Sequence, residues 1–178
     1  MFIFVIKEYN GAAVANKSFG GMGMIAFFMV FPALFMVHEM EELIFMPGFV
    51  TKLPASKATK KIQAYYSPLV FNLTVLEQLL LLLLILGISY YSKHFGFYVT
   101  VIIAYIYHIV GHLVQSLVLR RYVPGLIGGI ITAVISLAFL FSFGLVDYCY
   151  YLYALVTLLI IFGNILLSFK VSNQLLWQ

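Results

Sequence analysis

The residues best suited to chemistry lie in one short run, His38-Glu39-Met40-Glu41-Glu42. In a helix, His38, Glu41 and Glu42 have the spacing i, i+3 and i+4, so they share one face, whereas Glu39 points about 100° away. Imidazole nitrogens and carboxylate oxygens are ordinary ligands of zinc, iron and manganese. They also transfer protons in many enzymes. The run therefore predicts either a metal site or an acid–base pair.

A second polar stripe lies later in the chain, where His108, His112 and Gln115 follow each other at i, i+4 and i+7. Two histidines four residues apart on a helix match the geometry by which helices hold zinc. The first run also resembles, as His-x-x-Glu-Glu, the inverted zinc-protease motif His-x-x-Glu-His. A carboxylate-bridged site with two metals, as in some helical bundles, is equally compatible with these residues.

These patterns give each residue an expected role. A divalent metal, zinc or iron, is expected on four ligands, which are His38, Glu42, His108 and His112. On the protease analogy Glu41 is the general base. Separately, Glu77 of the second span is expected to be a catalytic carboxylate. Asn164 and Gln115 are expected to support the site, although hydrogen bonding between helices explains Gln115, Asn72 and Glu39 more simply.

Composition identifies the elements that must position these residues. The chain of 178 residues is 64% hydrophobic and 9% charged, with a mean hydropathy of +1.08, whereas soluble domains carry roughly 25% charged residues. A span needs about 20 mostly apolar residues. The sequence predicts an all-α, polytopic integral membrane bundle, a single transmembrane domain over 1–178 with spans near 21–46, 69–91, 95–119, 123–145 and 148–169.

The ionisable residues inside these spans are a functional hypothesis by default, because they are costly in lipid. Four of the six acids (Glu39, Glu41, Glu42 and Glu77) and three of the four histidines fall within spans, and no lysine or arginine lies well inside one. Neighbouring carboxylates in a low dielectric cannot all stay ionised unaided. Protons, protonated histidines or a metal cation must neutralise them.

Basic residues between the spans predict the orientation. Seven of the ten would share one side, namely Lys52, Lys57, Lys60, Lys61, Arg120, Arg121 and Lys170, against Lys7, Lys17 and Lys93 on the other. The positive-inside rule then places the N-terminus outside and the C-terminus in the cytoplasm. The expected location is the plasma membrane. With this orientation the polar residues of four spans all lie in the cytoplasmic half.

The chain resembles the HXXEE-domain family of membrane proteins over about residues 25–168. The name of that family describes the motif seen here as His38, Glu41 and Glu42. The family also carries a further histidine, to which His108 or His112 would correspond, and a Gly-Asn pair, which Gly163-Asn164 fits. The resemblance implies site residues and a membrane location, but no particular reaction.

Three functions fit these observations. The first is a metal-dependent membrane enzyme that hydrolyses or oxidises a lipid or other apolar substrate. The second is a metal-free enzyme in which a His–Glu pair moves protons, an arrangement similar to that of the five-helix sterol isomerases. The third is a transporter of protons or metal ions, for which a homodimer interface would supply the missing polar path. The expected partner is the lipid bilayer, and the basic pI of about 9.1 is attributed to topology rather than to nucleic acid.

Overall fold

The computed structural model describes residues 18–145 and 147–176, and all regular structure in these ranges is helical. The helices are α2 (Ser18–Thr51), α3 (Lys57–Tyr65), α4 (Pro68–Ser92), α5 (Gly96–Leu119), α6 (Leu126–Ser142) and α7 (Tyr148–Leu176). Helices α2, α4, α5 and α7 are long and apolar enough to cross a membrane, and α6 is a shorter apolar helix. The predicted all-α membrane bundle is therefore confirmed. The lysines expected on the outer side at positions 7 and 17 lie outside the described residues.

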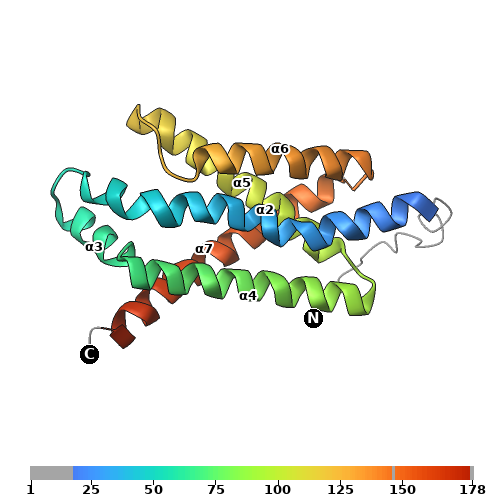
Figure 1. The fold of residues 1–178 in the computed structure, drawn as a ribbon, viewed down its shortest axis with the longest axis horizontal. Coiled ribbons are helices and arrows are strands. Elements are labelled where there is room, and N and C mark those ends of the chain that lie inside the picture. The colour runs from blue at the N-terminus through green and yellow to red at the C-terminus, as the bar shows by residue number, and fades with distance from the viewer. Residues whose placement is uncertain (1–17, 146, 177–178) are drawn as a thin grey trace.

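The helices form two layers (Figure 1). Helix α2 lies between α6 and α4 and contacts both, while α5 and α7 contact each other and cross behind this layer. The Cα atoms of α2 and α5 stay more than 8 Å apart. Large side chains fill the space between these two helices, and the four residues expected to bind metal lie in it.

Aromatic side chains make up much of that filling. Phe28 and Phe31 of α2 meet the ring of Tyr98 on α5 edge-on, at centroid distances of 5.4 and 6.0 Å. A proline inside a helix leaves the carbonyl four residues earlier without its usual partner, and Pro32 does this to Phe28. The Tyr98 hydroxyl donates a 3.0 Å hydrogen bond to that carbonyl. The same tyrosine thus packs the core and satisfies the gap left by the proline.

The helix boundaries differ from the predicted spans in α2, α6 and α7, and α7 continues beyond the predicted end at 169 to Leu176. Helix α2 continues beyond the predicted end at 46, through Pro47, to Thr51. Helix α6 is shorter than the predicted span 123–145, because Pro124 and the left-handed Gly125 (φ 88°) precede its first turn. The polar stretch after α2 contains α3, an amphipathic helix that is too short and too polar to be predicted as a span.

The three basic stretches lie at one end of the bundle. Figure 1 shows α3, the connection from α5 to α6, and the C-terminal end of α7 at the same end. Helix α3 contacts α2, α4 and α7, which ties these segments together. The three basic stretches therefore share one end of the bundle, as expected, whereas the assignment of this end to the cytoplasm stays a prediction.

Candidate metal centre

The structure brings together the four residues expected to bind metal. His38, Glu42, His108 and His112 each offer one ligand atom, and these atoms all lie within 4.8 Å of one another. His38 and Glu42 are one turn apart on α2, and the other two are one turn apart on α5. His38, Glu42 and His112 are buried, and His108 is partly buried. Two helix faces thus meet in the wide gap between α2 and α5.

The contacts inside this group leave lone pairs facing each other. His112 Nε2 lies 2.8 Å from Glu42 Oε1 and 3.0 Å from His108 Nε2. A neutral imidazole carries one N–H, so a single proton on His112 Nε2 cannot fully serve both partners. Metal–nitrogen bonds of 2.0–2.1 Å in a tetrahedral site place ligand atoms about 3.3 Å apart. The separations of 2.8 and 3.0 Å are close to this value and are compatible with a shared cation.

The tautomer of His38 points the same way. His38 Nδ1 lies 2.8 Å from the carbonyl oxygen of Gly125, and a carbonyl only accepts hydrogen bonds, so Nδ1 carries the hydrogen. In the neutral ring, Nε2 is then a bare acceptor. That atom is buried, has no hydrogen-bond partner among the described residues, and lies 3.6 Å from Glu42 Oε1. Histidines that bind metals typically donate their other N–H to a carbonyl or carboxylate in this manner.

Glycines of the α6 N-terminus allow this close approach. A Cβ atom at Gly125 would lie 2.6 Å from Glu42 Oε1 and 2.8 Å from His38 Cε1. At Gly129 it would lie 3.1 Å from His38 Nδ1. These glycines let α6 pack closely against the surface of α2 that carries His38 and Glu42.

Glu41 is turned away from the four ligands towards the start of α6. Its carboxylate accepts hydrogen bonds from the backbone N–H groups of Ile127 (3.3 Å) and Gly128 (2.5 Å), and from the Tyr122 hydroxyl. Helix N-termini bind anions because their first N–H groups are unpaired and the helix dipole is positive there. This placement favours an anchoring role, while the catalytic role expected from the protease analogy stays a prediction.

Glu39 lies near the site, although the sequence predicted for it only hydrogen bonding between helices. It is buried, and its Oε1 lies 3.8 Å from His38 Nε2. The spacing did hold a signal, because Glu39 and Glu42 are three residues apart and so share a side of α2. The site therefore contains two buried carboxylates, that of Glu42 within the group of four and that of Glu39 beside it.

The remaining expected site residues lie elsewhere. Glu77 on α4 accepts hydrogen bonds from Asn164 of α7 (2.9 Å) and from Gln78 (3.0 Å). Neither Glu77 nor Asn164 is a member of the four-residue group. Gln115 and Asn72 are exposed on the surfaces of α5 and α4. Glu77 and Asn164 thus form a separate polar pair, and the supporting role of Gln115 stays a prediction.

The comparison with known families follows this geometry. Residues 29–140 match the family described as a protein of unknown function with HXXEE motif. No curated protein and no solved structure matches the chain. The matched segment covers more than half of the chain and contains all four candidate ligands, whereas Gly163-Asn164 lies beyond it. The chain therefore belongs to the family of proteins with the HXXEE motif.

Proposed function

We propose that this protein is a membrane-embedded, metal-dependent enzyme that acts on a lipid or another apolar substrate. His38, Glu42, His108 and His112 would hold a divalent cation, zinc or iron. The observation that carries this proposal is the convergence of three imidazoles and a carboxylate within 4.8 Å in a buried gap. Nitrogen-rich sets with one carboxylate suit zinc and iron better than magnesium or calcium, which prefer oxygen ligands.

The chain's own residues divide the work around that cation. When bound, a divalent metal supplies Lewis-acid catalysis, which polarises a carbonyl or phosphoryl oxygen of the substrate. The carbonyl of Gly125 keeps the hydrogen of His38 on Nδ1 and so directs Nε2 inwards. Glu39, next to His38 Nε2, is placed to take up or release a proton. Glu41 holds the start of α6, and with it Gly125, against α2.

The surroundings support an apolar substrate. The four long helices present many large apolar side chains outwards, among them Ile44, Leu84, Val118 and Leu159, which suits contact with lipid chains. The ligand group lies on the two helix segments that lead to the basic end of the bundle. A substrate dissolved in the bilayer reaches such a site from the membrane and needs no aqueous channel.

One observation favours the metal-free enzyme as the second candidate. The 2.8 Å separation of His112 Nε2 and Glu42 Oε1 is the length of a direct hydrogen bond. Such a pair can pass a proton between two positions of a substrate, as an isomerase requires. The two candidates differ in whether the native protein retains a metal.

Elemental analysis of the purified protein separates these candidates. We expect about one zinc or iron per chain in protein prepared without chelators, and loss of that metal in both His38→Ala and Glu42→Ala. Matched controls are His94→Ala, on an exposed histidine between α4 and α5, and Glu77→Ala, on an intramembrane acid outside the group. Both should keep their metal. Wild-type protein that binds none, even after incubation with Zn²⁺ or Fe²⁺, would overturn the metal-dependent proposal.

The enzymatic part needs a separate measurement. Metal-loaded protein is incubated in vesicles made from a mixed lipid extract, and the lipids are followed by mass spectrometry. We expect a change in one lipid class that Glu42→Ala does not produce. If the lipids stay unchanged and metal ions or protons cross the vesicle membrane, the protein is a transporter and the enzymatic proposal is wrong.

A further inference from the structure

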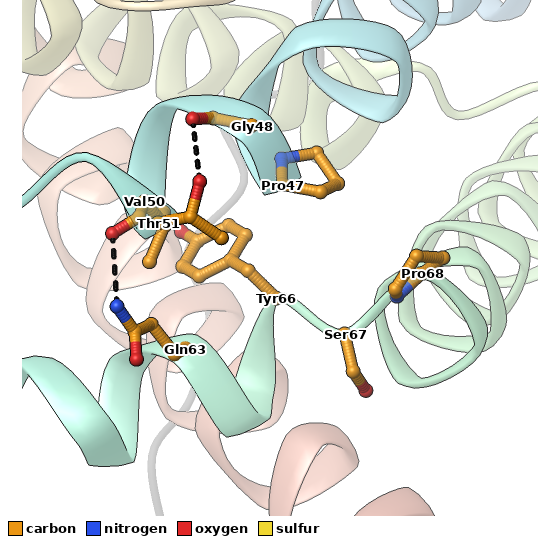
Figure 2. Close-up of a pocket in the computed structure, with 8 residues that line it drawn as sticks. All are labelled: Pro47, Gly48, Val50, Thr51, Gln63, Tyr66, Ser67 and Pro68. Atoms are coloured by element: carbon orange, nitrogen blue, oxygen red, sulfur yellow. Dashed lines mark hydrogen bonds between the residues drawn. The ribbon is translucent and has the colours of Figure 1, made fainter.

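A cleft of about 340 Å³ opens between the last turns of α2 and the short link from α3 to α4. Figure 2 shows the residues that line it, including Pro47, Gly48, Thr51, Gln63, Tyr66 and Ser67. All of them lie between the first two long helices or at their adjoining ends. The cleft therefore belongs to the basic end of the bundle, outside the four-ligand group.

The cleft is close to the candidate metal centre along α2. Pro47 follows Glu42 by five residues, which is about 7.5 Å along a helix. Tyr66 lines the cleft, and its phenol also interacts electrostatically with the carboxylates of the candidate metal centre. Burial raises the pKa of Tyr66 above its usual range, and the nearby carboxylates of Glu42 and Glu39 raise it further.

The position of Tyr66 is fixed by its neighbours. Its ring packs against Phe71 of α4 (4.9 Å between centroids) and Phe169 of α7 (5.5 Å). Figure 2 shows the ring tucked beside the turn of α2 that carries Val50 and Thr51. The ring of Tyr66 thus forms one wall of the cleft. Its hydroxyl lies within electrostatic reach of the carboxylates of Glu42 and Glu39.

The lining offers polar groups at a boundary between lipid and water. Ser67 Oγ is buried and has no hydrogen-bond partner among the described residues. Gln63 Nε2 donates to the carbonyl of Val50 at 3.3 Å, so its side chain bridges α3 and α2 across the cleft. Tyrosines and an amphipathic helix between two spans are typical of the membrane interface.

Basic residues flank the cleft at the end of α2 and on α3. Residues 43–76 contain four lysines and no acid. Lys52 and Lys60 are exposed. Lys52 directly follows Thr51, and Lys60 precedes Gln63 by three residues, which places both on one face of α3. This surface attracts an anion and would repel a cationic headgroup.

We propose that the cleft seats the phosphate-bearing headgroup of an anionic phospholipid, which is the substrate of the site at Glu42. The ester linkages of a phospholipid lie deeper in the bilayer than its phosphate, and the ligand group lies deeper along α2 than the cleft. The inference rests on the proposed function in one respect, that the bound lipid is the substrate. Lipid binding in the cleft stands on the geometry and charge alone.

Native mass spectrometry of the protein in mild detergent tests the inference, with phosphatidylglycerol and phosphatidylcholine as probes. We expect the wild type to retain phosphatidylglycerol preferentially. Gly48 lines the cleft, and a Cβ there meets nothing within 4 Å, so Gly48→Trp introduces a bulky side chain at the cleft and should abolish the preference. Gly87→Trp, at an equally open glycine of α4, is the matched control and should leave it unchanged.

A second variant keeps the test valid if Gly48→Trp does not fold. Lys60→Ala removes one exposed charge, which at a membrane surface contributes about 1 kcal/mol, so the Kd for phosphatidylglycerol should rise roughly fivefold. Equal binding of both lipids by the wild type, or unchanged selectivity in Gly48→Trp, would overturn the proposal. Tight binding of soluble glycerol 3-phosphate would overturn the lipid assignment. Metal content is measured on the same samples. A protein without metal would contradict the proposed function, whereas a protein without lipid selectivity would contradict the proposed binding in the cleft.

Discussion

His38 and Gly125 are joined across 87 residues of sequence by a 2.8 Å contact, in which the Nδ1 hydrogen of His38 is donated to the Gly125 carbonyl. The bond ties α2 to the residue that starts α6. It also directs the second ring nitrogen of His38 towards Glu42. The geometry of the candidate metal centre therefore depends on a backbone group of a helix that supplies no ligand.

Replacement of Gly125 should damage both stability and metal binding. The Gly125→Ala variant combines a φ of 88° with a Cβ 2.6 Å from Glu42 Oε1, and strain of this kind costs about 1–3 kcal/mol. We expect a lower unfolding temperature in detergent and a clear loss of bound metal. Gly111→Ala on α5 is the control, because a Cβ there meets nothing within 4 Å. A fully metal-loaded Gly125→Ala protein would contradict the tight packing described here.

Glu41 should behave as an anchor of α6. Its carboxylate accepts two backbone N–H groups at the helix N-terminus, and loss of a helix cap costs about 0.5–2 kcal/mol. Glu41→Ala should therefore lower the free energy of unfolding by that amount while the protein keeps its metal. Glu41→Gln separates the alternatives: a stable, metal-loaded but inactive protein would instead support the general-base role.

Tyr122 should titrate at unusually high pH. Burial and the bonded carboxylate of Glu41 raise its pKa from 10.0 to about 12. Because the folded-state pKa lies above the unfolded value, the stability that Tyr122 contributes is present below about pH 10 and is lost as the pH rises towards 12. The difference in phenolate absorbance between the wild type and Tyr122→Phe should show this step. Glu41→Gln should move it towards 10, and an unmoved step would argue against the Glu41 contact.

The Glu77–Asn164 pair should stabilise the contact of α4 with α7 independently of the metal. Asn164→Leu removes the 2.9 Å hydrogen bond to Glu77 Oε1, and such bonds between membrane helices contribute about 0.6–1.7 kcal/mol. We expect a decrease of that size in the free energy of unfolding, with unchanged metal content. Loss of metal in Asn164→Leu would mean that this pair belongs to the catalytic machinery after all.

Much of the fold could be predicted because apolar length is a strong signal in a membrane protein. All five predicted spans correspond to helices, and α4 and α5 lie close to the predicted limits. Helix α2 was predicted too short, since Pro47 looks like a terminator but is accommodated within the helix. Helix α3 was missed because its nine residues are polar and short, so they carry no transmembrane signal.

The clustering of the four candidate ligands could be predicted for a similar reason, because helical spacing fixes which side chains share a face. His38 with Glu42, and His108 with His112, followed from their i, i+4 spacing. Spacing could not say which neighbour each side chain meets. Glu41, adjacent to Glu42, turns to α6, and Glu39 becomes buried beside His38, because helices cover α2 on more than one side. The hydrogen bond from His38 to the Gly125 carbonyl could not be predicted, because every residue has a backbone carbonyl and the sequence does not show which one is used.

The position of Gly125 after all four ligands has a consequence for biosynthesis. A nascent chain that has been made only as far as α5 already contains His38, Glu42, His108 and His112, yet it lacks the carbonyl and the N–H groups that orient α2. Metal loading is thus expected to follow the insertion of α6 rather than to accompany that of α5. Maturation of the protein would then be gated by a late helix that binds no metal itself.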